Sequence, residues 1–273
     1  MFKDDRKLIE RMAPALQRIL VVDPSTAGAR MLADLMRSLV QCQVWVAPTA
    51  GKAIDLVKAV EPQIIFINHA ERGGVDGIEF TRRFRRSEAN ARQAPVIMIL
   101  TQPTAAAVIG ARDAGVHEFL RKPFTTADLL KRLEAVTLRP RDWVEAVTYV
   151  GPDRRRFNSG DYSGPLKRRS DSRTTPEKAR LTQAIKILKS AAGALDTDPA
   201  QAYRAMQAQG ADLQQVAVKT GDLKLAGAAA ELQRYLATVV DPRRLDPAQV
   251  AFHVAALAAF LPPEGPADRK RVA

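Results

Sequence analysis

A chain of 273 residues with a formal net charge of +12 is long enough to form two ordinary domains. Hydrophobic residues make up 46% of it and charged residues 26%, enough for real cores beneath a charged surface. The single cysteine, Cys42, excludes an intramolecular disulfide, and three scattered histidines give no metal-ligand spacing. The first residues resemble no secretory signal, and no apolar run reaches the ~18 residues of a membrane span, so we expect a cytoplasmic protein.

Residues 1–17 predict an N-terminal extension with a short helix at about 4–12, and residues 18–138 then alternate between apolar runs and helical stretches. The expected strands are 19–23, 44–46, 64–67, 96–100 and 117–120. The expected helices are 27–39, 50–60, 78–87, 105–114 and 126–136. Five such units predict an α/β fold with a doubly wound, five-stranded parallel sheet, whose ligand site lies beyond the carboxyl ends of the strands.

Residues 139–175 lose this periodicity and are rich in proline, glycine, serine and arginine, which predicts a basic linker. The stretch 138–180 holds 11 basic and 6 acidic residues and so carries five of the twelve net charges. A pattern Tyr-x-Gly-Pro-x-(Arg/Lys)-Arg-Arg occurs in it twice, thirteen residues apart. Either the linker is a solvated spacer, or the repeat binds an acidic partner through its cations and tyrosines. The candidate partner-binding residues are Tyr149, Arg154, Arg155, Arg156, Tyr162, Lys167, Arg168 and Arg169.

Residues 176–262 predict a small all-α helical bundle, followed by a basic tail over 263–273. Thr175-Pro176 and the Asp-Pro pairs at 198–199 and 246–247 are helix starts, and Asp222 begins a further helix. Gly210 is expected to interrupt or end the second of these helices. Residues 184–193 resemble the phosphotransfer helix of histidine phosphotransfer proteins, with Lys186 at the place of the phosphorylated histidine; an unrelated bundle is the alternative.

Several motifs in residues 18–137 resemble the receiver domain of two-component response regulators. They are Val21-Val22-Asp23 after the first strand, Asp76-Gly77 before the third helix, Thr101 after the fourth strand, and Lys122-Pro123-Phe124 after the fifth. In that family two acids after the first strand hold Mg²⁺, and an aspartate ending the third strand is phosphorylated. The threonine and lysine then contact the phosphoryl oxygens. The resemblance therefore implies a flavodoxin-like receiver fold with a signalling role.

The residues that the family's chemistry requires are missing here. Asp23 matches one acid, but Pro24 occupies the place of the second, and Asn68 occupies the acceptor position. Shifting the alignment by one residue places His69 there instead, and residues 62–70 contain no carboxylate. Because Mg²⁺ needs hard, usually charged oxygens and an acyl phosphate needs a carboxylate, we expect a pseudo-receiver that is not phosphorylated in the usual way and takes no metal or other cofactor.

The remaining pocket residues allow two interpretations. Lys122 either forms an ion pair with Asp23, bridged by Asn68, that fixes the pocket in one state, or is kept for its Lys-Pro turn. Thr101 and Phe119 occupy the positions of the family's switching threonine and aromatic residue, and their alternative role is core packing. The vestigial pocket is therefore Asp23, Pro24, Asn68, Thr101 and Lys122, with Phe119 on the switch-like surface.

Our leading hypothesis is a bacterial, phosphorylation-independent adaptor that binds other signalling proteins: a histidine kinase, a response regulator or a scaffold. The alternative is a nucleic-acid-binding regulator that uses the basic linker and the helical domain, although no helix-turn-helix, zinc finger or aromatic platform supports it. The sequence shows no Cys–His pair, phosphate loop or catalytic triad, so we do not expect an enzyme.

Overall fold

The computed structural model describes residues 3–70, 73–154 and 175–261, and the chain divides into two compact units. Unit 1 comprises Met1–Val144 and Tyr149–Ser163, and unit 2 comprises Glu145–Thr148 and Gly164–Ala273. Each unit is described by itself below. Within the described residues, no helix combines the length and hydrophobicity needed to cross a lipid bilayer.

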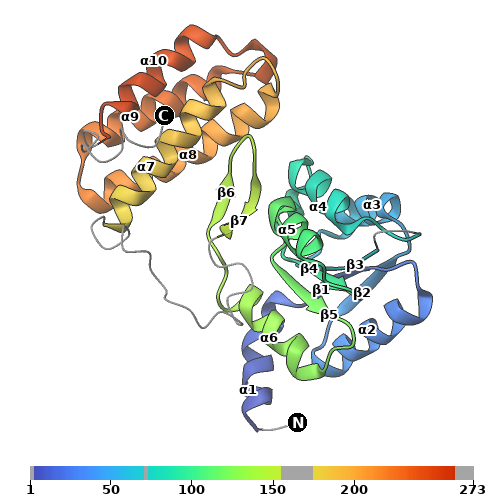
Figure 1. The fold of residues 1–273 in the computed structure, drawn as a ribbon. Helices are drawn as coiled ribbons and strands as arrows, with labels where there is room; N and C mark the ends of the chain where they lie inside the picture. The colour runs from blue at the N-terminus through green and yellow to red at the C-terminus, as the bar shows by residue number, and fades with distance from the viewer. Residues whose placement is uncertain (1–2, 71–72, 155–174, 262–273) are drawn as a thin grey trace. The chain divides into compact units, whose positions relative to one another are not determined.

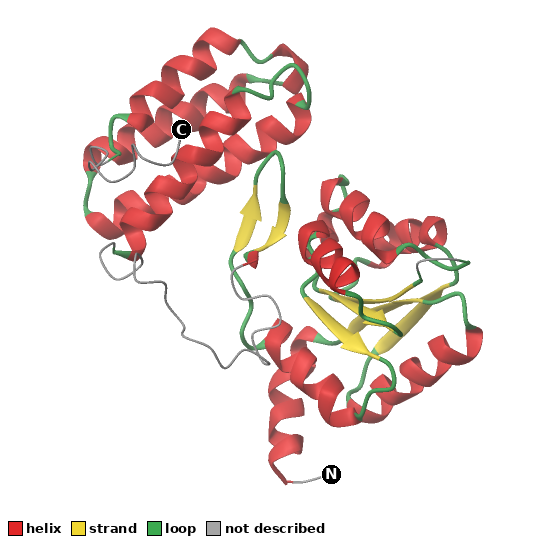
Figure 2. Ribbon diagram, viewed as in Figure 1, coloured by secondary structure: helices red, strands yellow, loops and turns green. Residues whose placement is uncertain are grey.

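Unit 1 contains a five-stranded parallel sheet with helices on both faces (Figures 1 and 2). Its strands are β1 (Arg18–Val22), β2 (Gln43–Ala47), β3 (Ile64–His69), β4 (Val96–Leu100) and β5 (Glu118–Arg121). Its helices are α1 (Lys3–Met12), η1 (Ala13–Ala15), α2 (Thr26–Leu39), α3 (Ala50–Val60), α4 (Gly77–Arg86), η2 (Asn90–Gln93), α5 (Ala105–Ala114) and α6 (Thr126–Thr137). The strand order β2-β1-β3-β4-β5 is that of a flavodoxin-like fold, which confirms the predicted fold class.

The sheet is buried on both faces because successive side chains of its strands point in opposite directions. Ile19 and Val21 pack in one apolar cluster with α1, α2 and α6. Leu20 and Val22 pack in a second cluster with α3, α4 and α5. The apolar runs predict this alternation, and each predicted strand and helix of unit 1 is found within two residues of its expected bounds.

Unit 2 is built from α7 (Pro176–Ala192), α8 (Pro199–Thr220), α9 (Leu223–Thr238), η6 (Pro242–Arg244) and α10 (Pro247–Ala258). Helix α8 packs on α7 and α9, and α10 packs on the same two helices, so short connections join neighbours in an antiparallel bundle (Figure 1). The expected helix starts are present: the side chains of Thr175, Asp198, Asp222 and Asp246 each accept a hydrogen bond from a backbone N–H in the first helical turn.

The predicted interruption at Gly210 is wrong, because α8 runs unbroken through this residue. A Cβ placed on Gly210 would lie 3.0 Å from Cγ of Gln233 on α9. Glycine is therefore used at this position for the close approach of two helices and not to end one of them.

The predicted linker is also wrong over its first part. Residues 143–152 form a two-stranded sheet of β6 (Trp143–Glu145) and β7 (Val150–Pro152). Periodicity could not find these strands because each is only three residues long. The rest of the linker and the basic tail lie outside the described residues.

Candidate functional site

Three strands of the sheet bring polar side chains together at its carboxyl edge. Asp23 follows β1, Asn68 lies near the end of β3, and Lys122 follows β5. Parallel strands all end at the same edge, and the strand order reverses between β1 and β3, where ligands of such sheets usually bind. Pro24 and Thr101, which follow β1 and β4, are exposed at this edge.

The Asp23 carboxylate is the centre of this cluster, and both of its oxygens have positive or hydrogen-bonding neighbours. Oδ1 accepts hydrogen bonds from Asn68 Nδ2 at 3.1 Å and from the backbone N–H of Ser25 at 2.9 Å. Oδ2 lies 3.8 Å from Lys122 Nζ. Asp23 is only 4% exposed, so these neighbours replace most of its contact with water.

Of the two interpretations of Lys122, the ion pair with Asp23 is present, but Asn68 does not bridge the two groups. Asn68 and Lys122 approach different oxygens of the same carboxylate. The net charge of the cluster is zero: one carboxylate, one ammonium and one amide.

Two residues that the sequence reasoning missed also hold Asp23 in place. Ser25 donates its backbone N–H to Asp23 and caps α2 with its hydroxyl group, which accepts from Gly28 N at 3.2 Å. A Cβ on Gly28 would lie 2.9 Å from Asp23 Oδ2, so glycine leaves room for the carboxylate. The serine ahead of an apolar helical pattern was the signal that could have identified this cap.

The donor set at this edge does not fit Mg²⁺. Magnesium in such sites is held by one or two carboxylates with further hard oxygens, but Asp23 already pairs with an ammonium group that would repel the ion. Among the described residues, no group of three or more His, Cys, Asp or Glu side chains is placed to hold a metal. Asn68 Oδ1 is buried without a hydrogen-bond partner in the described part of the chain, but it is a neutral amide oxygen.

The side chain of Asn68 is not suited to form an acyl phosphate. An acyl phosphate forms when a carboxylate oxygen attacks phosphorus, and the amide of Asn68 offers no such nucleophile. Its Nδ2 group donates to Asp23, so the side chain acts here as a hydrogen-bond donor. The observed role of Asn68 is therefore to hold the Asp23 carboxylate.

Phe119 on β5 lies beneath a charged side chain of α6. The guanidinium carbon of Arg132 is 5.9 Å from the centre of the Phe119 ring. Arg132 also forms an ion pair with Glu118 at 3.4 Å, and both of these side chains are largely buried. Phe119 also packs against the apolar cluster that contains Leu20 and Val22, which fits its alternative role in core packing.

Two residues of the first copy of the repeat already have contacts within this chain. Tyr149 is 6% exposed, and Arg154 forms an ion pair with Asp113 at 2.9 Å. The other candidate partner-binding residues, which are Arg155, Arg156, Tyr162, Lys167, Arg168 and Arg169, lie outside the described residues.

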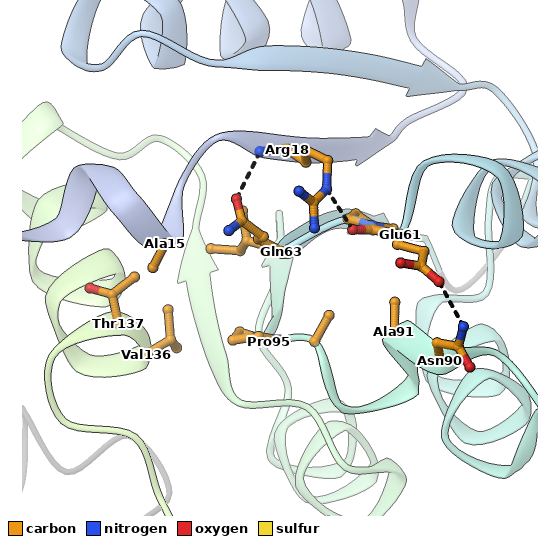
Figure 3. Close-up of a pocket in the computed structure, with 12 residues that line it drawn as sticks. Ala15, Arg18, Glu61, Gln63, Asn90, Ala91, Pro95, Val136 and Thr137 are labelled. Atoms are coloured by element: carbon orange, nitrogen blue, oxygen red, sulfur yellow. Dashed lines mark hydrogen bonds between the residues drawn. The ribbon is translucent and has the colours of Figure 1, made fainter.

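A separate hollow lies at the amino ends of β1, β3 and β4, on the other edge of the sheet (Figure 3). Its polar groups bond to one another: Arg18 Nε donates to Glu61 O at 3.0 Å, and Asn90 Nδ2 donates to Glu61 Oε1 at 2.8 Å. Gln63 Oε1 accepts from the backbone N–H of Arg18 at 3.0 Å. These bonds join the loops at the amino ends of the strands. Because the polar groups bond to one another, we do not take this hollow as the candidate site.

Comparisons with known proteins identify the same region of the chain. Residues 19–134 match the response regulator receiver domain family. A chemotaxis protein CheY homolog of Campylobacter jejuni is 31% identical over 119 residues, which are 44% of this chain and 91% of the relative. Chemotaxis protein CheY1 of Helicobacter pylori is 29% identical and matches over 44% of this chain and 95% of its own length. A crystal structure of a putative response regulator from Chloroflexus aurantiacus is 24% identical, with a TM-score of 0.41 over 45% of this chain and 99% of that one.

Proposed function

The chain belongs to the response regulator receiver domain family of two-component signalling. We propose that it is a phosphorylation-independent adaptor that acts through contacts with other signalling proteins. The observation that carries this proposal is the state of the Asp23 carboxylate. One of its oxygens accepts from Asn68 and Ser25, and the other faces Lys122. A receiver with this pocket has its ion pair in place without a phosphoryl group.

We infer the adaptor role because a domain that is not switched by phosphorylation still has a surface that can bind other proteins. In receivers the phosphoryl group changes the surface around the last helices and strand, whereas here the ammonium of Lys122 is already paired with a carboxylate. Phe119 is likewise held between β5 and Arg132. A fixed surface recognises a partner by shape and charge, and the partner classes we propose are a histidine kinase, another response regulator or a scaffold.

Incubation of the full chain with acetyl phosphate and Mg²⁺, followed by intact-mass measurement, tests the proposal. The matched control is Pro24→Asp/Asn68→Asp, which restores the two missing carboxylates at the same edge. We expect the natural chain to gain no phosphoryl group, whereas the control variant becomes labelled or binds Mg²⁺. A stoichiometric phosphoryl adduct on residues 18–138 of the natural chain would refute the proposal.

A further inference from the structure

Helix α10 of unit 2 has an exposed face that is apolar. Val250, Val254 and Leu257 are buried on its other face, where the helix packs on α7 and α9 (Figure 1). The exposed residues with the spacing of one helical face are Ala248, Ala251, Phe252, Ala255 and Ala259. Phe252 is 64% exposed, although burying such a side chain is worth about 1.5–3 kcal/mol. The helix is therefore apolar on both sides, whereas a surface helix usually has a polar outer face.

This face differs from the other places where unit 2 exposes large apolar side chains. Val218, Leu223 and Val240 are each followed directly by an exposed charged residue. Single apolar side chains among charges are ordinary on protein surfaces. From residue 247 to residue 261, in contrast, the chain contains no Asp, Glu, Lys or Arg, and its polar side chains are Gln249 and His253. The face of α10 is therefore a continuous uncharged surface, which is typical of an interaction site.

The ring of Phe252 is held in place by a row of aromatic contacts. It meets the ring of His253 edge-on, with 5.4 Å between the ring centres. The His253 ring in turn stacks on Tyr235 of α9 at 5.3 Å. The hydroxyl oxygen of Tyr235 accepts a hydrogen bond from the backbone N–H of Asp246 at 2.9 Å. Because these contacts already restrict the side chain, binding a partner through Phe252 costs little further side-chain entropy.

The spacing of the exposed residues makes the face complementary to itself. Two α10 helices can pack antiparallel about a twofold axis that passes between residues 251 and 252. Ala248 of one copy then lies opposite Ala255 of the other, and Ala251 lies opposite Phe252. Each phenylalanine ring meets alanines, which leave room for it, and the two rings do not compete for the same space. A twofold interface requires such a patch, because both copies use the same residues.

The charges at the two ends of α10 favour the same antiparallel arrangement. Arg243 and Arg244 are exposed immediately before the helix, whose amino end is capped by Asp246. The last turn contains no basic residue, so no side chain of that turn offsets the negative end of the helix dipole. Antiparallel packing places Arg244 of one copy beside Ala259 at the carbonyl end of the other. Each end of the helix therefore supplies the charge that the opposite end lacks.

We propose that the exposed face of α10, centred on Phe252, binds the same face of a second copy of the chain, so that the two α10 helices pack antiparallel. The helix has 12 residues and is about 18 Å long, so the contact is small. An interface of this size supports a transient dimer, with a Kd on the order of tens of micromolar.

This inference goes beyond the adaptor function and does not depend on the state of the Asp23 pocket. A dimer formed through unit 2 carries two receiver domains. A signalling partner that is itself dimeric can then bind both of them, and its second contact is strengthened by effective concentration.

Sedimentation equilibrium of the full chain from about 2 to about 200 µM tests the dimer. We expect the average mass to rise from 29.9 kDa towards twice this value. Phe252→Glu places two carboxylates at the twofold axis and should raise the Kd at least about tenfold. The matched control is Val218→Glu on α8, where valine is 80% exposed, and this variant should dimerise like the natural chain.

Both substitutions are made at exposed positions, so circular dichroism and thermal unfolding should show that both variants fold normally. A natural chain that stays monomeric over the whole range would overturn the proposal, and so would a Phe252→Glu chain that dimerises normally. A chain that stays monomeric but sediments with phosphatidylcholine vesicles through Phe252 would assign the face to a lipid surface instead.

Disulfide cross-linking tests the antiparallel arrangement. In a Cys42→Ser background, chains with Ala248→Cys and chains with Ala255→Cys are oxidised separately and as a mixture, with one chain isotopically labelled. The two cysteines lie opposite each other in the mixed dimer. In either pure sample the equivalent positions are about 10 Å apart along the helices, beyond the reach of a disulfide. We expect the mixed disulfide to predominate, and equal disulfide formation in the pure samples would refute the antiparallel dimer.

The charge at the helix ends gives a second check on the same arrangement. Arg244→Glu should weaken the dimer by about two- to fivefold at low salt, because it puts a carboxylate beside the carbonyl end of the partner helix. Added salt should reduce this difference. An Arg244→Glu chain that dimerises more tightly than the natural chain would contradict the proposed arrangement.

Discussion

Replacing Asn68 with aspartate adds a second negative charge to the vestigial pocket. This substitution tests whether Asn68 stabilises the pocket as a hydrogen-bond donor to Asp23. The substitution exchanges a donor for an acceptor 3.1 Å from Asp23 Oδ1. Two carboxylates at that distance repel by about 5 kcal/mol at an effective dielectric constant of about 20. Lys122 offsets part of this, so we expect Asn68→Asp to lower the free energy of unfolding by about 3–4 kcal/mol at pH 7.5.

Urea denaturation with and without MgCl₂ measures the effect, and Asn68→Ala is the control because it removes the donor without adding charge, at a cost of about 1–2 kcal/mol. The Asn68→Asp variant should become more stable with millimolar Mg²⁺, and also on acidification towards pH 5, because the folded pair holds a proton that the unfolded chain releases. The natural chain should respond to neither through this pocket. An Asn68→Asp variant as stable as the natural chain without Mg²⁺, or a natural chain stabilised by Mg²⁺, would refute our account of the site.

Three further predictions concern buried groups and helix interiors. Burial, reinforced by Arg85 and Arg141, lowers the pKa of His117 well below its usual value, so on acidification the unfolded chain binds a proton that the folded chain does not. The free energy of unfolding should therefore fall by up to about 1.4 kcal/mol per pH unit below pH ~6.5. Urea denaturation at several pH values should show that His117→Gln removes this contribution to the pH dependence. Gly227→Ala, where the new Cβ meets no atom within 4 Å, should raise the unfolding free energy of unit 2 by about 0.5–1 kcal/mol, whereas Gly210→Ala should show no such gain. Arg85→Lys should cost unit 1 about 3 kcal/mol in thermal unfolding, because an ammonium group cannot reproduce the planar fork of the guanidinium; a cost below 1 kcal/mol would contradict this role.

The alternation of strands and helices in the receiver domain could be predicted because each element has its own apolar pattern over many consecutive residues. Five buried strands and their helices each carry an apolar period, and side-chain caps mark most helix starts. The location of Asp23, Asn68 and Lys122 at the carboxyl edge of the sheet could also be predicted, because each of them is close to the end of a predicted strand. The ion pair between Lys122 and Asp23 was one of two interpretations of the sequence, and the contact of Asn68 did not follow from it, because which oxygen of Asp23 each neighbour approaches depends on side-chain positions that no spacing encodes.

Gly210 shows a different limit of sequence reasoning. A glycine in a helical pattern has two opposite uses: it can end the helix through its backbone freedom, or it can continue the helix and let a neighbour approach. Only the position of Gln233, which is 23 residues away on another helix, decides between them. The decisive contact is therefore tertiary, and a local pattern carries no trace of it.

The segment 139–154 has the composition of a linker, yet its last residues contact the end of α5 through Gly151 and Arg154. Its Gly-Pro pair and its arginines are the residues of a flexible, solvated chain, yet here glycine permits the contact with Gly115 and arginine covers the Tyr149 ring. Such a segment gains stability from a complementary surface and not from its own periodicity. Tyr149 and Arg154 contact each other and Arg154 pairs with Asp113, whereas position 153 contributes through its backbone and leaves no side-chain pattern in the sequence.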